Sequence, residues 1–397
     1  MRILMIAPQP FFQPRGTPFS VLHRLKALSR LGYQLDLLTY HLGENVEIEG
    51  VTIHRIPRVP LVKKIAVGPS KSKVWVDVFV ILKAMKMLRQ GRYDLIHSHE
   101  EAGFFAAYLA KKYQTLHLYD MHSSLPQQLS NFRFTRSSFL VKWFEKLESY
   151  TINSADAVIT ICPELYNYVK QRFPNQFSIL IENVADNSLV FGQATNPTNV
   201  QKTIKTNGER IVLYTGTFEP YQGIDLLIEA GKRVLQQAQD VKFVLVGGKP
   251  EQIRNYQDKV DELNLGESFI FTGSVMPQQV PQYIEASDIL VSPRTDGNNT
   301  PLKIYSYLRS GKPIVATRHI THTQVLNEAV SVLTDCTPEA FGNGVLKVLQ
   351  DPGLSQEIAD NARVLAQQNY SYESYLKKTS NVYTYLESQL EYAGGER

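Results

Sequence analysis

The sequence has few of the residues that build disulfides or cysteine-based metal sites. It contains two cysteines, Cys162 and Cys336, which lie in unrelated segments, and it has no Cys-x-x-Cys pair. Neither a zinc site nor a disulfide framework is therefore indicated. No run of about 18 apolar residues occurs, so a membrane-spanning helix is not expected. The apolar stretch in the opening MRILMIAP is shorter than a signal peptide requires, so it predicts a buried first strand instead. This favours a cytoplasmic protein.

Several motifs of nucleotide-binding proteins and hydrolases are also missing. The chain has no Gly-x-x-x-x-Gly-Lys-Ser/Thr, no Gly-x-Gly-x-x-Gly and no Gly-x-Ser-x-Gly. It also has no Asp-x-Asp pair, the usual cue for a nucleotide diphosphate held through a metal. Charge on a leaving phosphate would then have to be met by Lys, Arg, backbone N–H groups and helix ends. The net charge of +4 argues against a nucleic-acid binder but allows a local basic patch.

What the sequence does contain is a regular alternation of short apolar runs with helix-period segments. With 397 residues, 43% of them hydrophobic and 20% charged, the chain is globular and long enough for two domains. The apolar runs cover residues 2–8, 34–40, 94–99, 115–122 and 157–163, then 210–216, 242–248, 269–275, 288–294 and 313–317. Strands alternating with helices predict parallel sheets covered on both faces, an α/β architecture with ligands at the carboxyl ends of the strands.

The pattern is interrupted by a polar stretch between the two halves. We predict an N-terminal Rossmann-like domain over 1–187, a connection over 188–209, a C-terminal Rossmann-like domain over 210–375, and a helix with a tail over 376–397.

Loops with small residues follow the first strand of each half. Gly16 and Thr17 precede a helix in the first half, and Gly216, Thr217 and Gly223 do so in the second. Backbone can approach a ligand closely at such glycines, and a helix N-terminus favours negative charge. The alternative is that these loops are ordinary turns.

The segment NNTPLK, residues 298–303, repeats this arrangement, and Pro301 suits the first turn of a helix. Lys303 would then lie within that turn, where the helix dipole disfavours a cation. A bound anion nearby would make the position more favourable, so Lys303 is a candidate phosphate ligand. The alternative is a solvated surface lysine.

The order and spacing of these segments resemble a family 4 glycosyltransferase with the GT-B fold, over essentially the full length. The resemblance is carried by PRGTPFSVLHRLKALSRLGYQLDLLTY, YDLIHSH, ADAVITICPELYNYV, ENVAD, YTGTFEPYQGIDLLIEA, VLVGG, FTGSV, ASDILVSPR and SGKPIVAT.

The resemblance implies a hexosyltransferase that moves a sugar with retention of configuration and without a metal. A nucleotide sugar, UDP- or GDP-linked, would be the co-substrate, bound mainly by the C-terminal domain, and no other cofactor is expected. The acceptor, a glycan, glycolipid or other glycoconjugate, would lie against the N-terminal domain. The two domains would face each other across a cleft, with the C-terminal helix packing back toward the first domain.

Residue roles follow at the positions that match the family. Gly16 would lie against the donor phosphate, and His122 would contact the transferred sugar unless it is a strand-end histidine satisfied by the fold. His122 and Lys303 are the catalytic candidates, and no metal ligands are expected. The expected donor-binding residues are Gly16, Thr17, Gly216, Thr217, Gly248, Ser274, Val275, Arg294, Asn298, Asn299, Thr300, Pro301, Leu302 and Ser306.

The chain departs from the family in its acidic residues. The family commonly has two glutamates eight positions apart, and these positions hold Asn298 and Ser306. The stretch RHITHTQVL, residues 318–326, stands where the family usually shows Gly-Gly and Glu. Contacts to the ribose and to the sugar must therefore differ.

The cations of the family's first C-domain loop are replaced as well, by Thr217 and Gln222. Lys303 is the first candidate to replace them, followed by Arg294 and Arg318. The missing acids motivate an alternative, a catalytically silent nucleotide-sugar-binding partner subunit. A nucleotide-sugar epimerase on the same fold is a third interpretation, which the segment order disfavours.

Basic and apolar residues are interleaved in two segments of the first half. Residues 54–92 hold ten Lys or Arg and one acidic residue, Asp77, and a second cluster covers residues 131–146. Basic residues beside Trp and Phe suit docking on an anionic membrane and would favour a lipid-linked acceptor at its cytoplasmic face. The alternative is a buried helix over Val74 to Leu82 with solvated lysines at its end.

Overall fold

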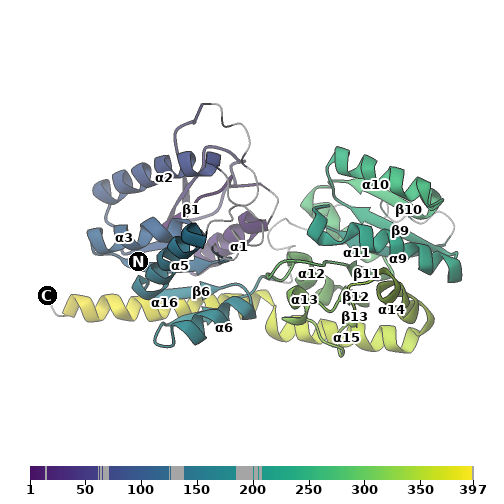
Figure 1. The fold of residues 1–397 in the computed structure, drawn as a ribbon. Helices are drawn as coiled ribbons and strands as arrows, with labels where there is room; N and C mark the ends of the chain where they lie inside the picture. The colour runs from purple at the N-terminus through teal and green to yellow at the C-terminus, as the bar shows by residue number, and fades with distance from the viewer. Residues whose placement is uncertain are drawn as a thin grey trace. The chain divides into compact units, whose positions relative to one another are not determined.

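The computed structural model describes residues 1–13, 16–60, 71–124, 138–184 and 208–395, with the single positions 62, 65, 126, 200 and 204 between them. Its contacts divide the chain into two compact units (Figure 1). Unit 1 comprises Met1–Asn183 and Tyr375–Arg397, and unit 2 comprises Val184–Ser374. Most of the predicted connection 188–209 lies outside the described residues.

Unit 1 contains a seven-stranded parallel sheet in the order β3-β2-β1-β4-β5-β6-β7. Its strands are β1 (Arg2–Ala7), β2 (Gln34–Thr39), β3 (Val51–Arg55), β4 (Leu95–His99), β5 (Leu116–Met121), β6 (Ala157–Thr160) and β7 (Ser178–Leu180). Its helices are α1 (Gly16–Arg30), α2 (Lys71–Gln90), α3 (Ala102–Tyr113), α5 (Ser138–Ser154), α6 (Pro163–Arg172) and the larger part of α16 (Tyr372–Gly395). Helices α2 and α3 bury apolar side chains against one face of the sheet, whereas α1 and α16 contact polar residues of the other.

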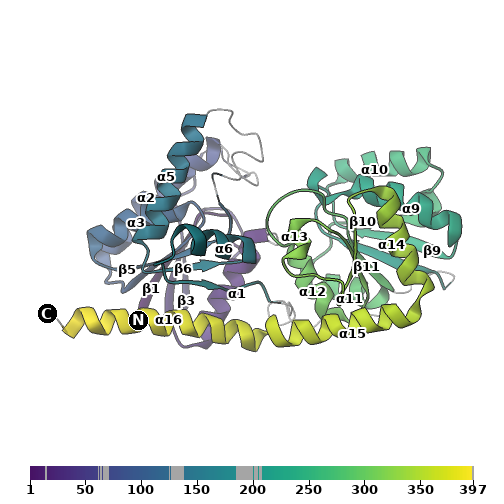
Figure 2. The same cartoon turned by 60° about the horizontal axis from the view of Figure 1, so that its bottom comes forward.

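Unit 2 contains a six-stranded parallel sheet in the order β10-β9-β8-β11-β12-β13. Its strands are β8 (Arg210–Thr215), β9 (Val241–Val246), β10 (Phe269–Gly273), β11 (Ile289–Ser292), β12 (Ile314–Thr317) and β13 (Val332–Thr334). Its helices are α9 (Ile224–Gln237), α10 (Pro250–Glu262), α11 (Val280–Ala286), α12 (Leu302–Ser310), α13 (Ile320–Thr323), α14 (Pro338–Gln350) and α15 (Pro352–Asn369). The short 3₁₀ helices are η1 (Pro220–Gln222), η2 (Gly266–Ser268) and η3 (Pro277–Gln279). Apolar clusters form on both faces of the sheet, which therefore lies between helices (Figure 2).

The predicted α/β architecture is confirmed, and each predicted apolar run forms a parallel strand. The sequence analysis missed three strands, β3, β7 and β13. All three are outermost in their sheets, and most of their residues are partly exposed. Because an edge strand has one neighbour and little burial, it does not need the continuous apolar run that identifies a central strand.

Helix α2 is buried along one side only. Val76 and Val80 face the sheet and are buried, whereas Trp75 is 70% exposed and Leu82 is 57% exposed. The expectation of a buried helix over Val74 to Leu82 is therefore wrong for its outward side. Among the described helices, none has the length and apolar character needed to cross a membrane.

Both sheets reverse their strand order beside their first strand. The neighbours of β1 are β2 and β4, and the neighbours of β8 are β9 and β11. Loops that leave adjacent strands in opposite directions open a crevice at the carboxyl edge, where ligands of open α/β sheets bind. Each unit therefore has one position at which a site is expected.

Substitution of Gly223, in the loop after β8, tests how tightly the carboxyl edge of the sheet in unit 2 is packed. Gly223 has φ +74°, and a Cβ there would lie 2.0 Å from the carbonyl oxygen of Pro293. We expect Gly223→Ala to lower the free energy of unfolding of unit 2 by about 2–4 kcal/mol, measured by urea denaturation. The control is Gly208→Ala, at φ +80° with no atom within 4 Å of the added Cβ. It should cost only about 1–2 kcal/mol, and equal losses in both variants would contradict the steric explanation.

Candidate functional site

The floor of the crevice in unit 2 is made of glycine backbone. The N–H of Gly216 donates to the carbonyl of Val246 at 2.9 Å, and that of Gly247 to the carbonyl of Gly273 at 2.9 Å. A Cβ on Gly247 would lie 1.8 Å from the Gly216 oxygen, and one on Gly248 would lie 2.5 Å from the Phe218 ring. The ends of β8, β9 and β10 therefore meet backbone to backbone.

Lys303 lies beside this floor. Helix α12 begins at Leu302, so Lys303 is in its first turn, as predicted. Its Nζ is buried without a hydrogen-bond partner among the described residues and lies 3.6 Å above the centre of the Tyr214 ring. A Cβ on Gly216 would be 3.4 Å from that Nζ. Lys303 is therefore not a solvated surface lysine.

A second cation, Arg294, follows β11 in the connection that leads to α12. Its guanidinium lies 5.0 Å from the centre of the Tyr221 ring, and its Nε donates to the backbone oxygen of Asp296 at 2.7 Å. Burial lowers the pKa of Arg294. Burial, and then the charge of Arg294, lower the pKa of Lys303 well below its usual range. Two desolvated cations at one edge of a sheet make a position that favours an anion.

Neighbouring side chains hold α12 in place and leave a further polar group unsatisfied. The Tyr307 hydroxyl accepts the backbone N–H of Thr215 at 2.9 Å, which ties α12 to the end of β8. The hydroxyl of Thr300, just before α12, is buried without a hydrogen-bond partner in the described part of the chain. A ligand oxygen could therefore bind a hydroxyl as well as an ammonium group.

The other predicted donor residues lie on these same loops. Ser274 donates to the carbonyl of Gly248 at 3.1 Å, and the carbonyl of Asn298 accepts from Gln324 at 2.6 Å. Asn299, Pro301 and Ser306 lie before and within α12, Thr217 follows β8, and Val275 follows β10. Arg318 pairs with Glu328 at an exposed surface, whereas Lys303 and Arg294 are buried enough to lower their pKa values, so these two are the stronger candidates of the three proposed cations.

The corresponding edge of unit 1 brings the first loop to the end of β4. Gly16 and Thr17 are the first two residues of α1, whereas the sequence indicated that they precede the helix. The Thr17 hydroxyl donates to Oε1 of Glu100 at 2.9 Å. Glu100 itself has the left-handed φ of 50°, unusual for a residue with a Cβ. The switch point of this sheet is therefore lined by polar side chains.

His122, predicted to contact the transferred sugar, follows β5 and is buried. Its Nε2 lies 2.9 Å from Nδ1 of His99 and 3.4 Å from Oδ1 of Asp120. The other oxygen of Asp120 is 3.2 Å from Nε of Arg24 and 3.4 Å from Nε2 of His97. His122 is thus the outermost member of a buried polar network.

Sequence reasoning missed this network, although a signal was present. His97 and His99 are two residues apart on β4, and Asp120 and His122 have the same spacing around the end of β5. In a strand this spacing places side chains on one face, and β4 pairs with β5 so that His99 lies opposite Asp120. Polar residues at alternate positions of two buried strands could therefore have identified it.

A set of acidic groups beside Glu100 was missed as well. Lys73 pairs with Glu101 at 2.6 Å, and the Tyr40 hydroxyl donates to Asp77 at 2.5 Å. Burial raises the pKa of Glu101, and it raises that of Asp77 to about 6. Carboxyl groups that titrate near neutral pH can accept a proton or bind a hydroxyl.

Among the described residues, one group has the composition of a metal site: His97, His99 and Asp120. Asp120 is already bound by the buried guanidinium of Arg24 at 3.2 Å. A metal cation there would be repelled by that charge, so the network does not fit a metal.

Comparison with known proteins agrees with this geometry. Residues 195–365 match the family model for glycosyl transferases group 1, and residues 14–186 match that for glycosyltransferase family 4. An uncharacterised glycosyltransferase of Methanocaldococcus jannaschii is 23% identical over 381 residues, covering 90% of this chain and 91% of its own. The alpha-monoglucosyldiacylglycerol synthase of Streptococcus pneumoniae is 22% identical over 337 residues, covering 80% and 71%.

Solved structures show the same fold. A sucrose-phosphate synthase from Thermosynechococcus elongatus superposes with a TM-score of 0.80 at 20% identity, covering 98% of this chain and 99% of its own. The HepE protein of Anabaena, solved in complex with UDP, gives a TM-score of 0.73 at 17% identity, covering 97% and 100%. Both halves are matched and the fold agrees, so this chain belongs to the family 4, group 1 glycosyltransferases and has the GT-B fold.

Proposed function

We propose that this glycosyltransferase moves a sugar, with retention and without a metal, from a UDP- or GDP-linked donor to a glycan, glycolipid or other glycoconjugate. Lys303 carries the proposal: its ammonium is buried beside Gly216 without a hydrogen-bond partner among the described residues. A desolvated cation is unfavourable in the free protein and becomes favourable when a diphosphate binds next to it. The HepE protein, which shares the fold, was solved in complex with UDP, and this supports a nucleotide-linked donor.

In the reaction the bond between the sugar C1 and the diphosphate oxygen breaks while a bond from C1 to the acceptor oxygen forms. The leaving diphosphate gains negative charge, and one of its oxygens takes up the proton that the acceptor hydroxyl loses. In this proposal Lys303 and Arg294 stabilise that charge, and they can do so strongly because both are desolvated by burial. The sequence has no Asp-x-Asp pair to hold a metal for this role.

The alternative function is a catalytically silent nucleotide-sugar binder. Asn298 and Ser306 stand where the family has its two glutamates, and this substitution is the observation in its favour. A silent binder would bind a donor without transferring its sugar or hydrolysing it. Slow donor hydrolysis that disappears in Lys303→Ala would therefore exclude it.

The first experiment is a thermal-shift panel of UDP, GDP, ADP and their common sugar conjugates with the full chain. A ligand present at about 100 times its dissociation constant adds roughly 2.7 kcal/mol to stability. A shift with one base identifies the donor class for turnover assays. If no nucleotide shifts the Tm, the proposed donor binding is wrong.

Lys303→Met is expected to separate stability from function. Removing a buried, unpaired cation should raise the free energy of unfolding by about 1–3 kcal/mol at neutral pH. Because the pKa of Lys303 is lower in the folded than in the unfolded state, its destabilising effect is largest below the folded-state pKa. The gain should therefore shrink as the pH rises toward the ordinary lysine value of about 10.5. Urea unfolding at several pH values measures it.

The same variant should bind the donor about 10- to 100-fold more weakly, as expected for loss of a hydrogen bond between charged groups. Isothermal titration with the nucleotide from the panel measures this change. Lys232→Met, at an exposed position on α9, is the matched control and should change neither quantity. Lower stability together with unchanged affinity in Lys303→Met would contradict the assignment.

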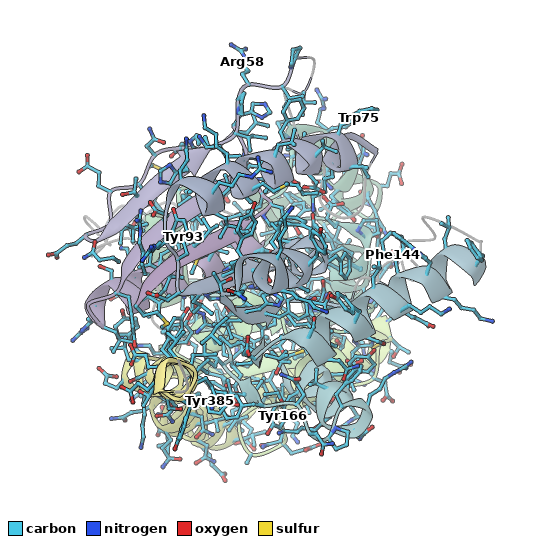
Figure 3. The ribbon with its side chains drawn as sticks, turned by 90° about the vertical axis from the view of Figure 1, so that its left-hand side faces the viewer. Arg58, Trp75, Tyr93, Phe144, Tyr166 and Tyr385 are labelled. Carbon is cyan, nitrogen blue, oxygen red and sulfur yellow. The ribbon has the colours of Figure 1, made fainter. Side chains whose placement is uncertain are left out.

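We also propose that unit 1 docks on the cytoplasmic face of an anionic membrane. The exposed fraction of Trp75 on α2 is 70%, and those of Phe139 and Trp143 on α5 are 75% and 48%. Figure 3 shows Trp75 on the outer side of α2, and Figure 2 shows the first turn of α5 projecting beyond the sheet. Residues 61, 63, 64, 66–70 and 131–137 of the two basic segments lie outside the described residues.

Charge complementarity supports an anionic bilayer as the occupant of this surface. Lys142 and Lys146 flank Trp143 and are exposed, and Lys86 is exposed further along α2. Aromatic side chains beside lysines favour the interface of an anionic bilayer. The relative from Streptococcus pneumoniae is named for a glycolipid product, which supports a lipid acceptor.

Vesicle flotation tests the docking surface. The wild type should bind vesicles of phosphatidylcholine with phosphatidylglycerol, and binding should weaken with salt. Lys142→Gln with Lys146→Gln should weaken binding by about 30-fold, from roughly 1 kcal/mol per charge. Trp75→Ser with Phe139→Ser should weaken it as well.

Met276→Ser, at an exposed residue of unit 2, is the control and should bind like the wild type. No binding to anionic vesicles, or equal binding to phosphatidylcholine alone, would overturn the proposal.

A further inference from the structure

The last helix of the chain reaches the polar network behind His122. Thr379 and Tyr383 are fully buried and lie four residues apart on α16, which places them on one side of the helix. The Tyr383 hydroxyl is 2.7 Å from Nδ1 of His97, and Nη1 of Arg24 donates to the Thr379 hydroxyl at 2.9 Å. The functions proposed above assign no role to either contact.

The charges of the network determine which atoms carry protons. Burial alone would raise the pKa of Asp120, but Arg24 and the neighbouring imidazoles outweigh it and hold the pKa well below its usual range. Burial lowers the pKa of His97, so this ring is neutral and carries one proton. The carboxylate lies 3.4 Å from Nε2 of His97 and places the proton there. Nδ1 is then an acceptor, and the Tyr383 hydroxyl donates to it.

The same reasoning extends to the next pair of rings. Burial, and then the nearby His97, lower the pKa of His99 well below its usual range, so this ring is also neutral. Its Nδ1 lies 2.9 Å from Nε2 of His122 and 3.7 Å from the Asp120 carboxylate. Its Nε2 is buried without a hydrogen-bond partner among the described residues.

A buried N–H without an acceptor is rarer than an acceptor without a donor. The Asp120 carboxylate lies 3.4 Å from Nε2 of His122 and 3.7 Å from Nδ1 of His99, so it favours a proton between these two nitrogens without choosing the ring. Because Nε2 of His99 has no acceptor among the described residues, His99 carries its proton on Nδ1 and donates it to Nε2 of His122. His122 then carries its own ring proton on Nδ1.

We propose that Tyr383 is a positioning residue for His122. Its hydroxyl fixes the ring of His97, and His97 with Arg24 fixes the Asp120 carboxylate. That carboxylate sets the tautomer of His99, and so that of His122. This inference rests on the proposed function, in which His122 contacts the transferred sugar. The C-terminal helix is thereby part of the acceptor-side machinery.

A purely structural role for Tyr383 is the competing explanation. Its ring packs against Tyr33 at a centroid distance of 5.1 Å, so its removal could simply loosen the helix. Tyr383→Phe keeps this ring and removes only the hydroxyl. Tyr385→Phe is the matched control, since Tyr385, labelled in Figure 3, stacks on Phe177 at 3.8 Å from the same helix.

The first test is spectroscopic and needs no substrate. In the full chain labelled with ¹⁵N-histidine, we expect His97 protonated at Nε2, and His99 and His122 protonated at Nδ1. Single His→Gln substitutions assign the signals. Tyr383→Phe should shift the Nδ1 signal of His97 and alter the signals of His122, whereas Tyr385→Phe should leave both unchanged. A wild-type His122 protonated at Nε2, or unaltered His122 signals in a folded Tyr383→Phe, would overturn the proposal.

The second test is kinetic. Tyr383→Phe should lower kcat for sugar transfer by roughly 3- to 10-fold, the effect of one hydrogen bond, with the donor KM changed by no more than about twofold. If Tyr383 acts through His122, the substitution should have no further effect in a His122→Asn background.

An undiminished effect in that background, or an equal loss in Tyr385→Phe, would overturn the proposal. If the chain transfers no sugar from any donor, the proposed function fails, while the spectroscopic test still decides the inference.

Discussion

Parallel pairing imposes one constraint from which the rest of this molecule follows: all the strands of a sheet end at the same edge. In both units the strand order reverses beside the first strand, so the loops after β1 and β4, and those after β8 and β11, diverge. Residues from distant parts of the sequence then meet without any dedicated scaffold. Gly216 and Lys303 become neighbours in this way, although they are 87 positions apart in the sequence.

The two units treat buried charge in opposite ways. In unit 1, Arg24 and Asp120 neutralise each other, and burial keeps His97 and His99 neutral, so the charges of the network are balanced within the protein. In unit 2, burial lowers the pKa of both Lys303 and Arg294, and the charge of Arg294 lowers that of Lys303 further, so an anion would stabilise the charged forms of both. The first arrangement suits the orientation of neutral hydroxyl groups, and the second suits the binding of a phosphate.

The sequence was sufficient for the architecture because the central strands are buried on both faces and must be continuously apolar. It revealed one edge strand, β10, but not the other three, β3, β7 and β13, which are partly exposed and lack a continuous apolar run. For the site, glycines and Lys303 could be predicted because each breaks a local rule of backbone or helix electrostatics. The ion pair between Arg318 and Glu328 could not be predicted, because two side chains ten positions apart in an irregular segment form no recognisable sequence pattern. The roles of Thr379 and Tyr383 depend on where α16 packs, which composition does not encode.

The division of the chain has a consequence for its biosynthesis. Unit 2 is made from one continuous segment, whereas unit 1 needs residues from Tyr375 onward in addition to the first 183. During translation the second unit can close as soon as its segment leaves the ribosome. Unit 1 cannot be completed until α16 is synthesised, because Arg24 and His97 bond to Thr379 and Tyr383 of that helix. The part of the protein that is synthesised first is therefore the part that finishes folding last.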